Sequence, residues 1–473
     1  MRSLFTNISI AVVLNALVKP LSLLLENVAQ DRIGHADWGM YSGLQSWGFI
    51  LLILCDFGLN QFTTQRLASK PEALHENYPY LFGLKITLSL LYPALMLGLG
   101  YLWGFDAREL YYLFWLSLIQ AAMQLLAFFR ANFQAAQAFK TDSFASVFDR
   151  ILLMLGVGVL LHTGMNLESF VWLRVLVVML TLALFYVLLV RQQGGIQLPK
   201  WDKKHSPELL KGSFSFAMVM FLYSMNEKID QVMIRELVGN DENGLYAGAY
   251  RWLEAISMYQ WTVLPIFFAR FAASVNDNEK LPPLLQFGQY INALPMLLVC
   301  SCLVWQGDLL LFLFKSSTPA QIETIRYCLQ VLMAALGFGA IFSILSTLLT
   351  ATHHEKFVNV LIILGIAVNV GWNAVFVPEY GARAAAWGTF ANYAFLSLAY
   401  LVYLFLRPEL RALALLARKQ SLQLILLYAV SLFTFWGLGQ IWDNALFVIT
   451  AGTILYLLYS FPLIRILLKA RTQ

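Results

Sequence analysis

Long apolar runs recur from one end of the chain to the other, separated by short polar stretches. A helix needs about 20 apolar residues to cross the ~30 Å hydrocarbon core of a bilayer. The strands of a membrane barrel would instead alternate in polarity over about 10 residues. The pattern therefore predicts an all-α integral membrane protein with fourteen spans, near 8–30, 39–62, 79–102, 109–130, 144–162, 168–190, 212–234, 244–269, 287–305, 327–350, 357–377, 384–406, 421–440 and 444–464.

The loops between these spans carry an uneven distribution of positive charge. With both termini cytoplasmic, the inner segments hold twenty Lys and Arg and the outer loops hold six. Cytoplasmic loops of membrane proteins are enriched in these residues, so the bias supports this orientation and an even number of spans. The net charge of +5 is then a result of topology, and a nucleic-acid surface is not expected.

An internal repeat divides the chain. The segment RIGHADWGMYSGLQSW (32–47) matches LVGNDENGLYAGAYRW (237–252) at a constant offset of 205. Self-similarity over such a distance indicates duplicated halves, and an even number of helices per half makes the two copies parallel. The identities pair Gly34 with Gly239, Gly39 with Gly244, Tyr41 with Tyr246, Gly43 with Gly248 and Trp47 with Trp252.

The repeat predicts two six-helix bundles followed by two further transmembrane helices. The first lobe is expected over 1–191 and a cytoplasmic linker over 192–211, where Gly, Pro and Lys are frequent. The second lobe is expected over 212–410, and the two additional helices over 411–473.

Twelve charged residues lie inside predicted spans, not counting the first and last residue of each span, and all are between residues 19 and 254. A charge at the middle of a membrane costs at least ~2.5–3.5 kcal/mol on insertion scales, so these residues must face protein or water. They predict a hydrated cavity. The set is Lys19, Lys85, Arg150, Arg174, Lys228 and Arg251 with Glu26, Asp56, Asp149, Glu227, Asp230 and Glu254.

Helical spacing places several of these charges on common faces. Lys19 and Glu26 share a polar stripe of the first span, Glu227 and Asp230 share one of the seventh, and Arg251 and Glu254 share one of the eighth. The alternative is that they form interhelical salt bridges that only fix packing. Lys85 is expected to snorkel to the interface, Asp56 to act as a cap or hinge partner, and His35 to be solvated in a loop.

Several motifs resemble the polysaccharide transporter family, the oligosaccharide-lipid or O-antigen flippases of the multidrug/oligosaccharidyl-lipid/polysaccharide (MOP) exporter superfamily. They are DFGLNQFTTQRLAS (56–69), EKIDQVMI (227–234), YGARAAAWGTF (380–390) and the Gly-x-Tyr patterns that open the second and eighth spans. The resemblance covers about residues 1–400. It implies two lobes that alternate in access and move an undecaprenyl-diphosphate-linked oligosaccharide from the inner to the outer leaflet of the bacterial inner membrane.

This resemblance also implies a transporter and not an enzyme. The implied partners are the lipid-linked oligosaccharide, membrane lipids, and polysaccharide polymerase and chain-length regulator proteins. No resident cofactor or metal is expected, and no nucleotide-binding loop is present in the sequence, so H⁺ or Na⁺ coupling or facilitated equilibration would drive the cycle.

A diphosphate is multiply negative, and Arg or Lys in a partly desolvated cavity is a suitable counterion. We expect Lys19, Arg150, Arg174, Lys228 and Arg251 to contact the substrate. The acidic residues would compensate these cations or carry the coupling ion, because desolvation shifts carboxylates toward protonation near neutral pH. They are Glu26, Glu227, Asp230 and Glu254.

Other functions remain open from the sequence. A multidrug or cation antiporter of the same superfamily would favour acids and aromatics in the cavity, and a lipid II flippase can have fourteen helices. A membrane glycosyltransferase or polymerase usually needs large outer loops with catalytic residues. The longest predicted outer loop here, roughly 306–326, is short.

Overall fold

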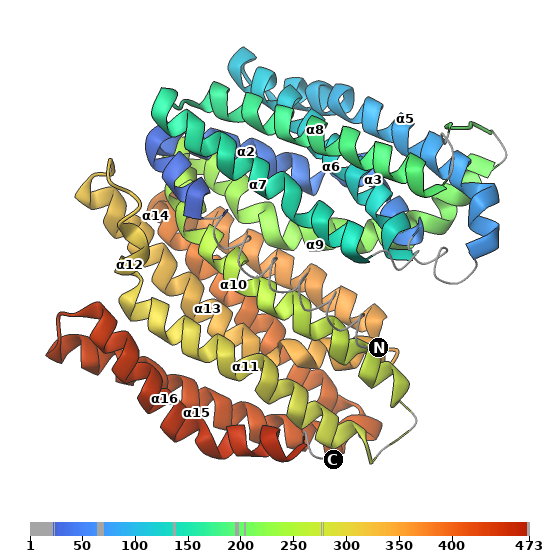
Figure 1. Cartoon of the computed structure of the whole chain (residues 1–473). Coiled ribbons are helices and arrows are strands. Elements are labelled where there is room, and N and C mark those ends of the chain that lie inside the picture. The colour runs from blue at the N-terminus through green and yellow to red at the C-terminus, as the bar shows by residue number, and fades with distance from the viewer. Residues whose placement is uncertain are drawn as a thin grey trace. The chain divides into compact units, whose positions relative to one another are not determined.

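The computed structural model describes residues 22, 24–63, 71–135, 139–193, 198–202, 205–275, 277 and 279–470. Every regular element in these ranges is a helix (Figure 1). After the first helix, described over 24–33, they are α2 (His35–Ile50), α3 (Ile53–Asp56), α5 (Pro71–Trp103), α6 (Ala107–Ala135), α7 (Phe139–Thr163), α8 (Leu167–Gln193), α9 (His205–Val238), α10 (Asn240–Ala273), α11 (Leu281–Gln306), α12 (Asp308–Leu311), α13 (Pro319–Ala351), α14 (Glu355–Leu406), η1 (Pro408–Leu410), α15 (Arg411–Ile441) and α16 (Ala445–Ala470).

These helices confirm the predicted all-α membrane fold. Eight of the described helices are long and apolar enough to cross a membrane: α5, α6, α8, α11, α13, α14, α15 and α16. The helices that carry most of the intramembrane charges, α7, α9 and α10, are not among them. The long α14 holds two predicted spans, which meet at Gly381, where φ is 58°.

Two compact units divide the chain. The first comprises residues 1–235 and 239–244, and the second comprises 236–238 and 245–473. The seventh predicted span, α9, lies in the first unit up to Arg235, together with the opening turn of α10. The lobe boundaries expected from the repeat, with a linker over 192–211, stay a prediction.

The repeated motif has a glycine of positive φ at the same position in both copies. Gly34 and Gly239 each precede a helix, α2 or α10, with φ of 94° and 104°. L-residues with a side chain rarely adopt positive φ, so glycine at this position is explained by the turn into the helix. The Tyr and Trp of both copies are buried in the helices that follow.

Within the first unit, α2 crosses the opening turn of α10 at two glycines of the repeat. A Cβ added to Gly39 would clash with the backbone of Asn240, and one added to Gly244 would clash with the backbone of His35. Asn243 Nδ2 donates to the Gly39 carbonyl at 2.7 Å. The motif therefore allows two backbones to approach closely, as small residues do between membrane helices.

An aromatic cluster holds α5, α6 and α8 together in the first unit. Tyr78, Phe82 and Phe128 stack with centroid separations of 5.3–6.1 Å, and Phe185 of α8 is fully buried in the same cluster. Aromatic pairs at such distances add stabilisation beyond their buried area.

The segment before α9 is fixed to α5. Lys200 N donates to the Pro79 carbonyl at 2.9 Å, and Trp201 Nε1 donates to Thr87 Oγ1 at 2.9 Å. A Cβ on Gly83 would clash with the Lys200 carbonyl. Residues 198–202 therefore run along α5 in backbone contact with it.

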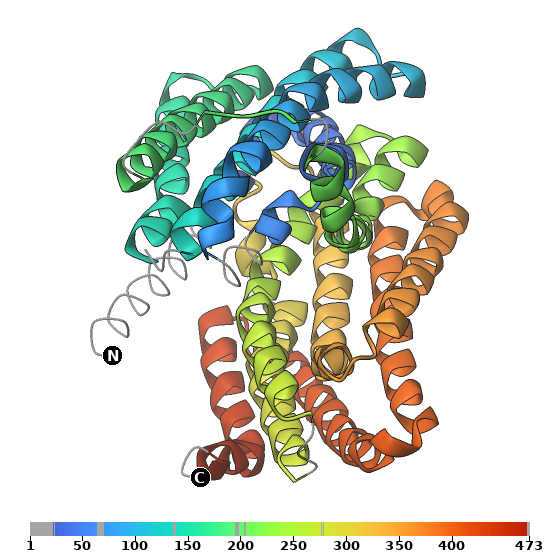
Figure 2. The same ribbon diagram turned by 90° about the vertical axis from the view of Figure 1, so that its right-hand side faces the viewer.

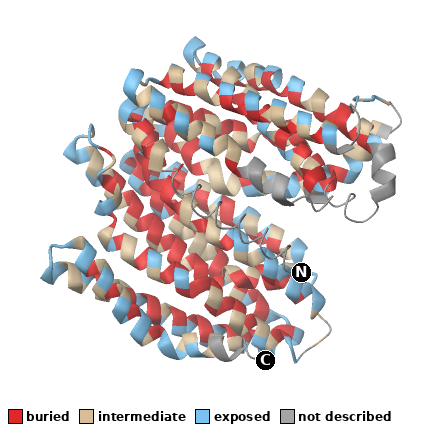
Figure 3. Ribbon diagram, viewed as in Figure 1, coloured by how far each residue is buried: buried red, intermediate tan, exposed pale blue. Residues whose placement is uncertain are grey.

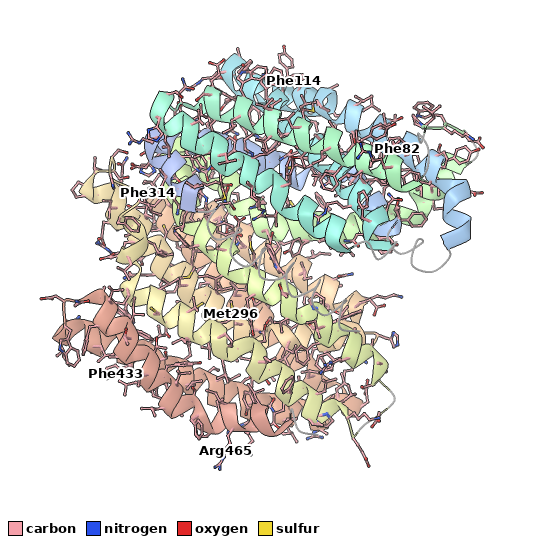
Figure 4. The ribbon with its side chains drawn as sticks, in the orientation of Figure 1. Phe82, Phe114, Met296, Phe314, Phe433 and Arg465 are labelled. Carbon is pink, nitrogen blue, oxygen red and sulfur yellow. The ribbon has the colours of Figure 1, made fainter. Side chains whose placement is uncertain are left out.

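In the second unit, α15 and α16 pack along α11 (Figure 1, Figure 2). Buried residues run along α13 from Ile325 to Ala351, and this helix packs on α11 and α14 (Figure 3). Met296 of α11 is 2% exposed, whereas Phe433 of α15 is 69% exposed (Figure 4). The two additional helices are thus an integral part of this unit's packing.

Candidate functional site

Four charged side chains in the first unit form a cluster, which we call the charged cluster: Glu26, Asp149, Arg150 and Arg174. Glu26 lies on the first helix, Asp149 and Arg150 lie on α7, and Arg174 lies on α8. Both arginines interact electrostatically with both carboxylates. Three of the predicted site residues, Glu26, Arg150 and Arg174, are therefore brought together.

Contacts inside the charged cluster are loose. Arg174 Nη1 lies 3.9 Å from Glu26 Oε1, with side chains 15% and 25% exposed. Arg150 Nη1 donates to Ser22 Oγ at 3.5 Å. Both distances exceed the 2.7–3.2 Å of a normal hydrogen bond. Arg174 also hydrogen-bonds to the Tyr41 side chain. Since a guanidinium presents about five N–H donors, each arginine still has donors that an anionic ligand can use.

Local packing brings α7 and α8 close enough to build this cluster. Gly156 of α7 lies where a Cβ would clash with the side chain of Leu173, the residue beside Arg174. A third cation, Arg130 near the end of α6, also interacts electrostatically with Asp149 and Arg150. Arg130, at the end of the predicted span 109–130, is one of the twenty cations counted in the cytoplasmic segments. With it, three arginines face two carboxylates, which leaves an excess of positive charge.

The charges of α9 lie in the first unit as well. Lys228 Nζ is 5.6 Å from the centroid of the Phe49 ring on α2, a separation at which a cation and an aromatic face attract. Asp230 is 3% exposed, and Glu227 is partly buried. The adjacent Gln231 accepts a hydrogen bond from Ser46 at 2.7 Å, which ties α9 to α2.

Two further predicted site residues belong to the second unit. Arg251 and Glu254 are on α10 in the second unit, where Arg251 is 6% exposed and Glu254 is partly buried. Lys19 lies outside the described residues. The assignment of all these side chains to substrate or ion binding stays a prediction. Among the described residues, no group of three His, Cys, Asp or Glu could hold a metal ion.

Lys85 corrects a sequence-based expectation. Its side chain is fully buried and pairs with Asp56, so the prediction that it snorkels to the interface is wrong. Hydropathy could place Lys85 near a span end, but only the packing of α5 against α3 shows its partner.

A second buried ion pair joins Arg235 of α9 to Glu109 of α6. The Arg235 guanidinium also lies 4.4 Å from the centroid of the Phe105 ring, and Gly43 of α2 leaves room for its side chain. Arg235 is one of the six cations counted in the predicted outer loops. The sequence feature that could have indicated this packing is the repeated Gly43, which has no side chain and leaves space for another residue.

His35 is also buried, at 7% exposure, so the expectation of a solvated loop histidine is wrong. Gln30 Nε2 lies 3.0 Å from His35 Nδ1 and donates to the Gly244 carbonyl at 2.7 Å. Burial lowers the pKa of His35, and the nearby carboxylates of Asp241 and Asp31 partly oppose this shift. A neutral ring with Nδ1 as acceptor fits these contacts.

Comparison with known proteins supports the resemblance. The polysaccharide biosynthesis protein family (Polysacc_synt) matches residues 4–268. No curated protein matches the sequence.

Solved structures of low sequence identity share the fold. The lipid II flippase MurJ, in an inward closed conformation, is 16% identical with a TM-score of 0.72 over 97% of this chain and 99% of that chain. An inward-facing multidrug resistance MATE family transporter of the MOP superfamily is 13% identical, with a TM-score of 0.68 over 84% of this chain and 96% of that chain. An outward-facing multidrug resistance MATE family transporter of the MOP superfamily is 14% identical, with a TM-score of 0.61 over 88% of this chain and 96% of that chain.

The family match covers more than half of the chain, and the structural matches extend over most of it. Together with the long apolar helices, they identify a multi-pass membrane protein with about fourteen transmembrane helices. The chain belongs to the polysaccharide biosynthesis protein family and has the fold of the MOP superfamily.

Proposed function

We propose that this protein is a flippase that moves an undecaprenyl-diphosphate-linked oligosaccharide from the inner to the outer leaflet of the bacterial inner membrane by alternating access. The observation that carries the proposal is the charged cluster within a chain of this family. Its arginines are partly exposed, and their contacts with Glu26 and Ser22 are long. A diphosphate can form charge-assisted, bidentate hydrogen bonds with such guanidinium groups.

The carboxylates have a complementary role in this proposal. Glu26 and Asp149 compensate the arginines when no substrate is bound, which limits the cost of holding cations within the membrane. Glu227, Asp230 and Glu254 are candidates to carry the coupling H⁺ or Na⁺. Lys228, Arg251 and Lys19 would extend the anion-binding surface, and both termini would be cytoplasmic. Polysaccharide polymerase and chain-length regulator proteins are the proposed downstream partners.

The test is genetic and biochemical. Deleting the gene should cause a lipid-linked oligosaccharide to accumulate on the cytoplasmic side, and the wild-type gene should restore surface glycan. Arg150→Gln and Arg174→Gln should each reduce the restored glycan at least tenfold. Arg418→Gln, at an exposed position of α15, is the matched control and should restore it fully. Intact surface glycan in the deletion strain, without a compensating paralogue, would contradict the proposal.

A second candidate function is the translocation of lipid II. It is favoured by the match to MurJ over nearly the whole of both chains. The same deletion strain separates the two functions, because accumulation of lipid II with unchanged surface glycan would favour this candidate. A multidrug antiporter is less consistent with three clustered arginines, since a cationic drug would be repelled by them.

A further inference from the structure

The segment before α9, described over residues 198–202, is expected from the sequence to lie in a cytoplasmic linker. In the structure it runs along α5, which is long and apolar enough to cross a membrane. Two of its side chains are large, apolar and exposed: Leu198 at 68% and Trp201 at 63%. Apolar surface of this kind is unfavourable in water, so the position of the segment along α5 decides what surrounds it.

The contacts with α5 give the depth of the segment in the bilayer. This helix ends at Trp103, which is 60% exposed and belongs to a residue type enriched at membrane interfaces. At 1.5 Å per residue, Pro79 lies about 36 Å and Thr87 about 24 Å from Trp103 along the helix. The hydrocarbon core is about 30 Å thick. With Trp103 at one boundary of the core, the other boundary therefore falls between Pro79 and Thr87, close to Gly83.

The segment crosses this second boundary. Lys200 N donates to the Pro79 carbonyl on the aqueous side, and a Cβ on Gly83 would clash with the Lys200 backbone. Trp201 Nε1 donates to Thr87 Oγ1 on the hydrocarbon side, and the Thr87 hydroxyl donates to the Gly83 carbonyl at 2.9 Å. The indole N–H is thus satisfied within the protein, as is needed at a depth where water is scarce.

The face of α5 that holds the segment continues as an exposed apolar surface. Leu90 and Leu91 lie one turn beyond Thr87 and are 73% and 51% exposed, and Leu95 in the next turn is 45% exposed. Residues three and four apart share a helix face. In the middle of a membrane span such side chains contact acyl chains. The exposed ring of Trp201 extends this lipid-facing surface to the interface.

We propose that residues 198–202 form an interfacial membrane anchor whose partner is the phospholipid of the adjacent leaflet. Leu198 and Trp201 lie among the first methylene groups of the acyl chains, and Lys200 lies at the level of the headgroups. A Trp ring is suited to this depth because it is apolar with one polar atom, and a Lys side chain can extend to water past an apolar boundary. The hydrogen bond to Thr87 sets the depth of the ring.

This contact concerns the protein and its membrane and is independent of the transported substrate. With both termini cytoplasmic, as proposed above, the leaflet is the inner one. The connection between the two repeats is then a membrane-bound element and not a free cytoplasmic loop.

Photo-crosslinking identifies the molecules that contact the segment. In the full-length protein, p-benzoylphenylalanine replaces Leu198 or, in a second variant, Trp201. Each variant is reconstituted in vesicles of phosphatidylethanolamine and phosphatidylglycerol and illuminated, and mass spectrometry measures the phospholipid adduct. Its yield at both positions should be at least fivefold higher than at Glu279, an exposed residue between α10 and α11. It should approach the yield at Leu426, which is 66% exposed on α15.

Two results would overturn the proposal. Adduct yields at Leu198 and Trp201 no higher than at Glu279 would place the segment in water. A crosslinked protein dimer in place of the lipid adduct would show that a second copy of the chain covers this surface.

The hydrogen bond is tested with the crosslinker at position 198 and a second substitution, Thr87→Val. Loss of the acceptor should release Trp201 and lower the yield of lipid adduct at least twofold. Thr434→Val is the matched control, because it removes only a bond to the Val430 carbonyl at an exposed position of α15, and it should leave the yield unchanged. An unchanged yield in Thr87→Val would overturn the assignment of Thr87 as the residue that sets the depth.

Discussion

Polar side chains connect helices in both compact units, but their chemistry differs. In the first unit, buried contacts include the ion pairs Lys85–Asp56 and Arg235–Glu109. In the second, α11 is joined to α13 and α15 by neutral groups, as in Gln289 Nε2 to Ser421 Oγ at 2.8 Å. Neutral hydrogen bonds hold helices without a charge to compensate, whereas a buried ion pair depends on the protonation and position of both partners.

We infer from this difference that the two kinds of contact have different roles. The α11–α15 contacts, including Ser301 with Ser431 at 2.5 Å, are suited to a permanent assembly. Ion pairs next to a helix break or a crossing of two helices are suited to contacts that form and separate. Four substitutions can break or sharpen this contrast, and they are ordered from the largest expected effect to the smallest.

Lys85→Met should have the largest effect. It leaves the Asp56 carboxylate buried without its cation, which costs about 3–5 kcal/mol of unfolding free energy. Lys85→Met/Asp56→Leu should recover most of that loss, because no charge then remains to compensate. Unfolding in mixed detergent micelles measures both. A double variant as unstable as the single one would show that packing, and not charge, dominates the site.

Gly39→Ala should destabilise the α2–α10 crossing by about 1–3 kcal/mol, the usual cost of overpacking. The added methyl group would clash with the Asn240 backbone, which cannot move aside as a flexible side chain can. Gly98→Ala is the matched control, because nothing lies within 4 Å of a Cβ at that position. The control should be neutral or slightly stabilising in the same unfolding measurement.

Gln289→Leu tests the neutral contacts. It removes hydrogen bonds to Ser421 and to the Ile341 carbonyl, and the expected loss is about 0.6–1.7 kcal/mol, the range measured between membrane helices. Gln420→Met is its control, since neither amide atom of the buried Gln420 has a hydrogen-bond partner among the described residues. This control should not lose stability. If Gln289→Leu instead lowered the free energy of unfolding by several kcal/mol, the neutral contacts of the second unit would be as important as the ion pairs of the first.

His35→Gln should have the smallest effect, and this effect should depend on pH. Its pKa is lowered in the folded protein from 6.5, so the unfolded chain binds the proton more readily. The contribution of the neutral His35 ring to the free energy of unfolding is therefore fully present above pH 6.5 and decreases as the pH falls below it. Melting temperatures at pH 7.5 and 5.5 should differ more for the wild type than for His35→Gln. If the melting temperatures of the two proteins change equally between these pH values, the pH dependence comes from groups other than His35.

Much of the fold could be predicted from the sequence because hydropathy is a local property. Fourteen apolar segments predict the membrane fold, and the repeated Gly34 and Gly239 predict equivalent turns. The predicted break between the eleventh and twelfth spans, at 378–383, contains Gly381, where φ is 58° and the two parts of α14 meet. Helix ends were less accurate: α9 extends from His205 to Val238, past both ends of the predicted span 212–234.

The site was less predictable because it depends on which helices are neighbours. Spacing places Glu227 and Asp230 on one face of a helix, but it cannot say that Arg174 meets Glu26 or that Lys85 meets Asp56. Those pairs are separated by many residues in the sequence and form only when the first unit packs. The charge count predicted that intramembrane charges need partners, and the packing of α3, α5, α7 and α8 shows which ones.

The attachment of residues 198–202 to α5 has a consequence for the biogenesis of the chain. Since Lys200 is hydrogen-bonded to Pro79, the polypeptide leaving the first repeat is anchored only a few residues before α9 begins. During synthesis, the second repeat would then begin to fold from a fixed position beside α5. Separately expressed halves should reassemble better when the cut follows Asp202 than when it precedes Leu198, because only the former division leaves the anchor on the first fragment.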